Sequence, residues 1–111
     1  MSNVTRTYFM LNVDQMDRAV AFYKEVLGPV IRYESETWTE IKIGDATVAL
    51  HAGGGSPKPS GLTVEVLDLD EACDAVRRMG GQVVDGPLEQ GSATLAEVAD
   101  SEGNGFTLVR G

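Results

Sequence analysis

The chain of 111 residues is long enough for one domain with a proper hydrophobic core, or for two very small units that share one. Apolar residues make up 42% and charged residues 23% of it, as in ordinary globular proteins, and the formal charge is -8. Nucleic acid and anionic membranes repel such an acidic chain, so neither is an expected partner, whereas a neutral or cationic small molecule is compatible with it.

The sequence carries no sign of export or of membrane insertion. Its N-terminal stretch has no basic start followed by an apolar run, and no later segment is long enough to cross a bilayer. Its single cysteine, Cys73, has no internal partner for a disulfide. These features predict a reduced, cytoplasmic setting.

Residues 8–28 predict a strand that runs directly into an amphipathic helix. Apolar side chains alternate from Phe9 to Val13 and then recur at three- and four-residue steps from Met16 to Leu27. Gly28 followed by proline is typical of a helix end. We expect Phe9, Leu11 and Val13 to pack beneath the helix. The opposite face of the strand then carries Tyr8, Met10 and Asn12.

Three more strands are predicted in this half, at residues 30–35, 37–43 and 47–51. Gly44-Asp45 suits a tight two-residue turn between the last two, because glycine accepts a positive φ. Counting outward from this turn pairs residue 38 with 51 and residue 40 with 49. The helix side of the hairpin then carries Ile41, Ile43, Val48 and Leu50. The other face carries Trp38, Glu40, Lys42, Thr47, Ala49 and His51.

A Gly/Pro/Ser-rich run at about residues 53–60 predicts a linker, after which the pattern restarts. Asp68 followed by Glu71 is typical of a helix-capping box. Gly86-Pro87 is expected to end a strand, and the facing of residues 93–99 stays open. The elements predicted after the linker are a strand at 62–66, a helix at 68–80 with Cys73 in its apolar stripe, and strands at 82–85, 93–99 and 105–109.

The two halves, at about residues 4–52 and 61–111, are an internal repeat of one strand, one helix and three strands. Residues 11–19 align with residues 64–72. Neither half of about fifty residues buries its sheet alone, so we expect both to share a core in a single domain over 1–111. The sheet faces turned away from the helices would then enclose a concavity, which is where a functional site is expected.

The pattern V-x-x-M-x-R-A-x-x-F-Y-x-x-x-L-G, from Val13 to Gly28, resembles the first module of the vicinal oxygen chelate superfamily. That superfamily includes glyoxalase I, extradiol dioxygenases, and fosfomycin- and bleomycin-resistance proteins. In the second half, GLTVEV, a helix ending in MGG and D-S-E-G-N-G-F-T-L are similar to it too. The resemblance covers nearly the whole chain. It implies an α+β fold of two tandem βαβββ modules with curved mixed sheets and helices on the outer face, often assembled as a homodimer with ligand sites in the concave sheets.

In the metal-dependent members of that superfamily, one ligand opens the first strand of each module and another lies on the last strand. The resemblance places these four positions at Tyr8, Ala49, Gly61 and Thr107. Ala, Gly and Thr offer no competent metal-binding side chain here, and a lone Tyr is a poor ligand. His51, the only histidine, lies two residues past the second position. The sequence therefore predicts neither metal nor cofactor, which counts against glyoxalase, dioxygenase, epimerase and fosfomycin-transferase activity.

Trp38 and His51 are the leading candidates for ligand contact. One prediction is a flat surface on which a ligand stacks, with the imidazole as a titratable group at its edge. An equally weighted alternative is a core or interface pair in which the histidine forms its hydrogen bonds within the protein. Tyr8, expected deeper in the site, offers a hydroxyl to a ligand or fills the place of the lost metal. Glu40 attracts a cation, acts as a base or is simply solvated. The predicted ligand-binding set is Trp38, His51, Tyr8, Glu40, Ala49 and Thr107.

Three functions remain open. The first is a metal-free protein that binds, and in the manner of the bleomycin-resistance branch sequesters, an antibiotic or another bulky organic ligand of cationic or aromatic character. The second is a metal-independent, lyase- or isomerase-like enzyme that uses Tyr8, His51 or Glu40 as acid or base. The third is a scaffold or regulatory partner without a small ligand. A concave cavity walled by Trp38 and His51 favours the first two, and a filled face favours the third.

Overall fold

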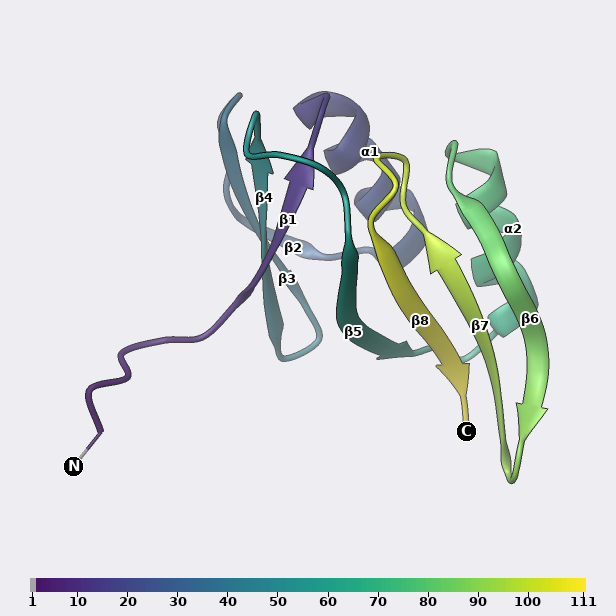
Figure 1. Ribbon diagram of the computed structural model, residues 1–111. Coiled ribbons are helices and arrows are strands. Elements are labelled where there is room, and N and C mark those ends of the chain that lie inside the picture. Colours follow the sequence, from purple (N-terminus) through teal and green to yellow (C-terminus); the bar gives the residue numbers. More distant parts are fainter. Residues whose placement is uncertain (1) are drawn as a thin grey trace.

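The computed structural model describes residues 2–111, which form two four-stranded sheets and two helices (Figure 1). The predicted α+β class and the repeated order of elements are confirmed. The first half contains β1 (Phe9–Val13), α1 (Met16–Leu27), β2 (Val30–Tyr33), β3 (Trp38–Ile43) and β4 (Ala46–Ala52). The second half contains β5 (Pro59–Glu65), α2 (Leu69–Arg78), β6 (Gln82–Gln90), β7 (Ala93–Ala99) and β8 (Gly105–Arg110).

Both sheets have the same mixed topology. The strand order is β1-β4-β3-β2 in one and β5-β8-β7-β6 in the other, and only the first pair of each is parallel. β1 and β5 are in contact where the sheets meet, and α1 and α2 contact each other (Figure 1). We refer to the sheet face turned away from the helices as the open face. No helix within residues 2–111 has the length and apolar character needed to span a membrane.

The β3–β4 hairpin has the predicted turn and register. Gly44 has a φ of +58°, which glycine adopts without strain. Trp38 pairs with His51, and Glu40 pairs with Ala49. Because side chains alternate along a strand, this register decides the facing of the whole hairpin. The helix side carries Ile41, Val48 and Leu50, all fully buried, and Ile43, which is 8% exposed.

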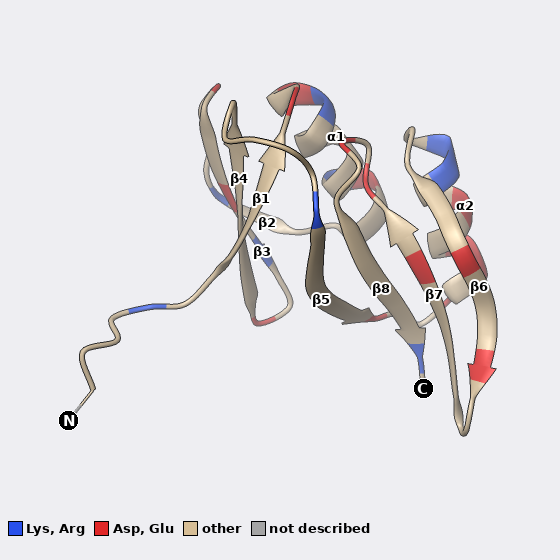
Figure 2. Ribbon diagram, in the orientation of Figure 1, with Lys and Arg blue, Asp and Glu red and all other residues tan. Residues whose placement is uncertain are grey.

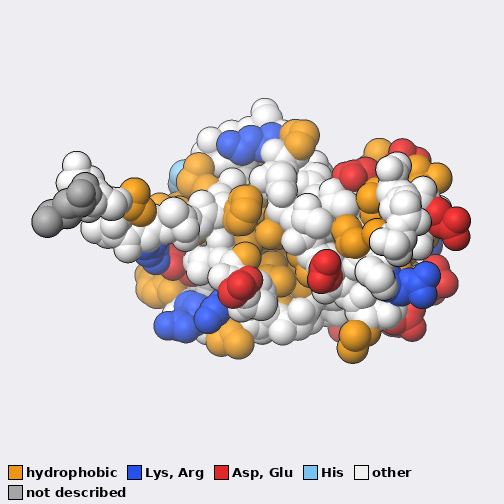
Figure 3. Space-filling model, turned by 90° about the horizontal axis from the view of Figure 1, so that it is seen from below, with side chains coloured by type: hydrophobic (Ala, Val, Ile, Leu, Met, Phe, Trp, Pro, Cys, Tyr) orange, Lys and Arg blue, Asp and Glu red, His pale blue; other side chains and the backbone are white. Residues whose placement is uncertain are grey.

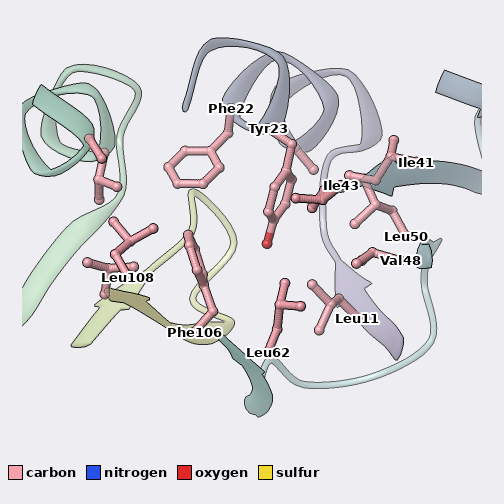
Figure 4. Packing of buried hydrophobic residues seen from close by; sticks show 14 of the residues in the cluster. Leu11, Phe22, Tyr23, Ile41, Ile43, Val48, Leu50, Leu62, Phe106 and Leu108 are labelled. Carbon is pink, nitrogen blue, oxygen red and sulfur yellow. The ribbon is translucent and has the colours of Figure 1, made fainter. Parts of the chain in front are cut away.

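One hydrophobic core joins the two halves. Phe22 and Tyr23 of α1 pack against Phe106 of β8, with ring centroids 6.3 and 6.1 Å apart (Figure 4). Leu11 from the first half and Leu62 from the second lie next to each other near these rings and are buried (Figure 4). Residues of both sheets thus bury one another, as expected for halves that are too small to fold alone.

The turn between β7 and β8 adds polar contacts to this core. The Tyr23 hydroxyl donates a hydrogen bond of 2.6 Å to the buried carboxylate of Asp100. Burial raises the pKa of Asp100, while the hydrogen bond from Tyr23 opposes that rise. The side-chain amide of Asn104 donates to the backbone carbonyl of Asn12 at 2.8 Å. The end of the second half is therefore tied to both α1 and β1 of the first.

Phe9 differs from the sequence-based prediction. It was expected beneath α1 with Leu11 and Val13, but 39% of its surface is exposed while the other two are buried. Phe9 is the first residue of β1, at the end of the strand remote from the start of α1. The face predicted for Phe9 from the alternation is correct, but α1 does not cover this end of β1.

β6 also differs from the prediction, because it continues through Gly86-Pro87 to Gln90. Its pairing with β7 shifts register between Asp85 and Leu88 instead of ending. Such an irregularity accommodates a proline, which cannot donate to the ladder. The structure also shows which way the side chains of β7 face. Ala96 and Val98 are buried on the helix side, so the residues that alternate with them lie on the open face.

Candidate functional site

Three ring-bearing side chains lie together on the open face of the first sheet, and we call Tyr8, Trp38 and His51 the aromatic row. Trp38 and His51, partners on β3 and β4, have ring centroids 5.5 Å apart and planes inclined at 58°. Tyr8, directly before β1, meets Trp38 edge to face at 6.2 Å. The hairpin register therefore brings the predicted stacking residues into contact.

The Glu40 carboxylate, beside this row, is fully hydrogen-bonded. Arg6 donates to both of its oxygens, at 2.9 and 3.2 Å, and the Trp38 indole N–H donates at 2.9 Å. The bonds from Arg6 and Trp38 lower the pKa of Glu40, so it stays ionised at neutral pH. The Arg6 guanidinium also lies 4.6 Å from the centre of the Tyr8 ring. Glu40 thus positions its neighbours, and this geometry does not support its use as a free base or as a receptor for a cation.

His51 has a buried ring nitrogen without a partner. Its Nδ1 and the Oδ1 of Asn12, the residue paired with it on β1, form no hydrogen bond within residues 2–111. Gly54 covers both atoms: a Cβ at this position would lie 2.3 Å from Nδ1 and 2.5 Å from Oδ1. The Asn12 amide holds the loop in place by donating to the Ser56 carbonyl at 3.0 Å. The loop after β4 therefore closes over this part of the row.

The other predicted site residues are distributed over both sheets. Tyr8 is 43% exposed and therefore less deep than expected, because it precedes β1 instead of lying within it. Ala49 is completely buried in the first sheet. Thr107 belongs to the second sheet, where its hydroxyl donates to Glu97 at 2.9 Å. Within one chain, the predicted set therefore divides into the aromatic row with its neighbours and a separate position on β8.

The positions that correspond to metal ligands in the resembling family offer no suitable donor set. Tyr8 offers only a phenol, which is a poor ligand on its own; Ala49 and Gly61 have no donor atom in their side chains, and the Thr107 hydroxyl is bound to Glu97. Within the described part of the chain, no group of three or more His, Cys, Asp and Glu side chains is placed to hold a metal ion. These residues do not fit a divalent metal.

An open cavity of about 490 Å³ lies next to the aromatic row on the first sheet. Trp38 and His51 do not line it, so it is not the cavity that the sequence predicted between these two. The Arg6–Glu40 pair forms its border with the row. Basic residues occur on both helices, before β5 and at the end of β8, as well as in the N-terminal segment and on β2 and β3, from which Arg6, Arg32 and Lys42 meet at this cavity (Figure 2). We call this the basic cavity; its lining residues are Arg6, Arg32, Tyr33, Glu40, Lys42, Asp45 and Thr47.

Sequence analysis missed Arg6 and Arg32. A signal for Arg6 exists, because it continues the alternation of Tyr8, Met10 and Asn12 by one more step toward the N-terminus. A comparable signal exists for Arg32, because it alternates with the apolar Ile31 on β2; the irregularity in the β2–β3 pairing brings Tyr33 to the same lining.

The structure has two βαβββ modules that share a core and present a candidate site on the open sheet face. This is the paired-module architecture of the class that the sequence resembles. The family model of the Glyoxalase/Bleomycin resistance protein/Dioxygenase superfamily matches residues 5–108, and the chain belongs to this family. A lactoylglutathione lyase from Neisseria meningitidis serogroup A is 33% identical, over 91% of this chain and 86% of its own length. A probable lactoylglutathione lyase from Vibrio parahaemolyticus is 27% identical, with coverages of 99% and 93%.

Solved structures confirm the fold. A hypothetical protein from S. aureus superimposes with a TM-score of 0.83 at 22% identity, over 99% of this chain and 96% of that one. The fosfomycin resistance protein FosX from Listeria monocytogenes gives a TM-score of 0.77 at 14% identity, with coverages of 99% and 93%. At these identities the similarity concerns the architecture, while function depends on the site residues.

Proposed function

We propose that this protein binds a bulky small organic molecule, such as an antibiotic, without a metal ion, and that the aromatic row is its contact surface. The observation that carries this proposal is the mutual packing of Tyr8, which is exposed, with Trp38 and His51, which are partly buried. Their rings offer a large surface with polar edges, which suits a ligand with an aromatic part. A cationic ligand has less support at this position, because Glu40 is already paired with Arg6.

A metal-independent lyase or isomerase is the second candidate. The relatives named as lactoylglutathione lyases favour an enzyme, and the imidazole of His51, which lies beside Trp38 in the aromatic row, offers a group for proton transfer. In that case, turnover of a bound compound would continue after treatment with a chelator and would be lost in His51→Gln. Binding without turnover would support the first proposal.

Trp38 is the only tryptophan, so its fluorescence reports on the proposed site directly. An aromatic ligand found in a fluorescence screen should shift or quench this signal. Trp38→Ala should weaken its binding by about 1–3 kcal/mol, the scale of a lost stacking and burial contact, as measured by calorimetry. Leu67→Ala is the control, because Leu67 is completely exposed in the loop before α2. A ligand that binds equally well to Trp38→Ala and His51→Ala would show that the site lies elsewhere.

A further inference from the structure

Two cations of the basic cavity have no acidic partner. Arg32 and Lys42 form no ion pair within residues 2–111, although the chain has 17 acidic residues for 9 basic ones. Of the two acidic side chains that line the cavity, Glu40 is paired with Arg6, which leaves only Asp45. Seen from below, basic side chains lie beside the N-terminal segment (Figure 3). An excess of positive charge has therefore collected at one place on an anionic protein.

The local strand geometry brings these cations to one face. Ile31 pairs with Ile41, but Tyr33 pairs with Glu40, so β2 has one extra residue at Arg32. In a regular ladder, two consecutive residues point to opposite faces. The bulge changes this, and Arg32 and Tyr33 both line the cavity. Ile31 lies on the helix side, so alternation already turns Arg32 toward Lys42, and the bulge adds Tyr33 to the same lining. Like charges gathered in this way repel one another, and an anion held between them would relieve the repulsion.

The remaining lining groups suit an oxyanion. Arginine presents a planar fork of donors that matches a carboxylate or a phosphate, and the lysine ammonium adds a second point of charge. The hydroxyls of Tyr33 and Thr47 are further donors in the lining. A cavity of about 490 Å³ is in the range of small-molecule sites. Nucleic acids and other large polyanions are excluded by the overall charge of -8.

We infer that the basic cavity receives the carboxylate or phosphate group of the same ligand whose aromatic part lies on the aromatic row. The inference rests on the proposed function, and it names the ligand class as an aromatic or otherwise bulky organic acid. The Arg6–Glu40 pair connects the two parts, since Arg6 lines the cavity and lies against Tyr8, while Glu40 accepts from Trp38. The ligand would therefore extend along the sheet, from the rings to Arg32 and Lys42.

Three fragments of nearly equal shape test this inference: benzoate, neutral benzamide and cationic benzamidine. Each is titrated at constant ionic strength into the ¹⁵N-labelled protein, with the backbone amides of Arg32, Lys42 and Thr47 reporting the cavity and the Trp38 indole N–H reporting the row. We expect benzoate to shift the cavity signals in a saturable manner and to bind more tightly than benzamide and benzamidine. Added salt should weaken benzoate binding.

Variants assign the effect to the two unpaired cations. Arg32→Gln and Lys42→Gln should each weaken benzoate binding about fivefold or more, the scale of a lost charge-assisted hydrogen bond. Lys24→Gln, an exposed lysine on α1, should leave it unchanged. Benzamidine binding as tightly as benzoate, no saturable benzoate shift, or unchanged benzoate affinity in both variants would overturn the inference. If benzoate shifts the cavity signals but no fragment changes the signal of the Trp38 indole, the proposed function would be contradicted and only the anion site would be supported.

Discussion

Glu40 is the residue on which the two parts of the proposed site depend. Its carboxylate orders Arg6 in the N-terminal segment and fixes the Trp38 indole, so it connects a segment without regular structure to the hairpin. An exposed ion pair of this kind contributes little to overall stability. Its effect is on orientation, because the Trp38 ring and the Arg6 guanidinium each take one preferred position against it.

Gly54 is predicted to be essential for the geometry of the aromatic row. In Gly54→Ala the new methyl group would overlap with His51 Nδ1 and Asn12 Oδ1, so the imidazole must move against Trp38. We expect a loss of about 1–3 kcal/mol in the free energy of unfolding, typical of overpacking, together with altered Trp38 fluorescence. Gly105→Ala is the matched control, since a Cβ there makes only ordinary contacts, the nearest at 3.5 Å. Unchanged fluorescence in Gly54→Ala would contradict the close approach.

The protein is predicted to bind no divalent metal in stoichiometric amount. The residues at the four relevant positions are Tyr8, Ala49, Gly61 and Thr107, and their side chains cannot replace imidazole and carboxylate ligands. Elemental analysis of the purified protein should therefore show no metal near one ion per chain, and added zinc, nickel or manganese should not raise the melting temperature. A strong thermal shift with one of them would refute the prediction, since a bound metal stabilises by mass action.

For individual side chains, positions that depend on strand alternation could be predicted from the sequence, whereas positions that depend on loops and bulges could not. Trp38 and His51 were placed opposite each other from the two-residue turn alone, and the structure has that pairing. The bulge that brings Tyr33 to the cavity beside Arg32 depends on the balance of pairing between two strands, which no local pattern records. The unpaired Nδ1 of His51 depends on where the loop around Gly54 settles.

Among the elements, α1 is capped by a residue from the other half of the protein. Gln15 at its N-cap makes no side-chain capping bond. Glu102, in the β7–β8 turn, accepts hydrogen bonds from the backbone N–H groups of Asp14 and Gln15, both at 2.9 Å, and pairs with Arg18 at 2.7 Å. A carboxylate is favoured at a helix N-terminus, where the macrodipole is positive. This contact therefore stabilises the helix and joins the two modules.

Glu102 should make stability depend on acid pH. Burial by itself would raise the pKa of Glu102, but hydrogen bonds from Arg18 and the backbone lower it from 4.5 to about 2. Because the folded pKa lies below the unfolded one, the stabilisation is present above about pH 4.5 and is lost as the pH falls toward 2. Glu102→Gln should cost up to about 3 kcal/mol at pH 7 and should flatten the dependence between these pH values.

Urea unfolding at several pH values measures this effect, and the difference between wild type and Glu102→Gln isolates it from the opposite tendency of Asp100. Glu25→Gln is the control, because Glu25 forms only an exposed pair with Arg78 on the helix surface. Equal pH dependence in the wild type and Glu102→Gln would show that the cap does not contribute.

Element boundaries were predictable where two independent signals agreed. α1 has both a clear helical period and Gly28 in the left-handed conformation at its end, and it spans the predicted residues. β6 was predicted too short, because the Gly86-Pro87 signal does not distinguish a strand end from an irregularity in pairing. The capping of α1 by Glu102 was not predicted, since it joins residues up to 88 positions apart.

For the whole molecule, the shared core leaves both open sheet faces without a cover. Helices cover the other face of each sheet (Figure 1), and the open faces retain large apolar side chains. Tyr33 is 57% exposed on the first sheet and Val84 is 62% exposed on the second. Apolar surface gathered in this way is typical of an interaction site. A second copy of the chain, which brings an equivalent open face, is the simplest occupant because closed two-fold pairs are the commonest oligomers.

We therefore expect a homodimer at micromolar concentration, with sedimentation giving twice the chain mass of 11.9 kDa. Met10→Glu introduces a charge on the open face of β1, where Met10 is 40% exposed, and should shift the equilibrium toward the monomer. Leu67→Glu introduces the same charge at a fully exposed position away from that face and should leave the dimer intact. A monomer mass for the wild-type protein, or equal dissociation of both variants, would show that the open face of β1 is not the dimer interface.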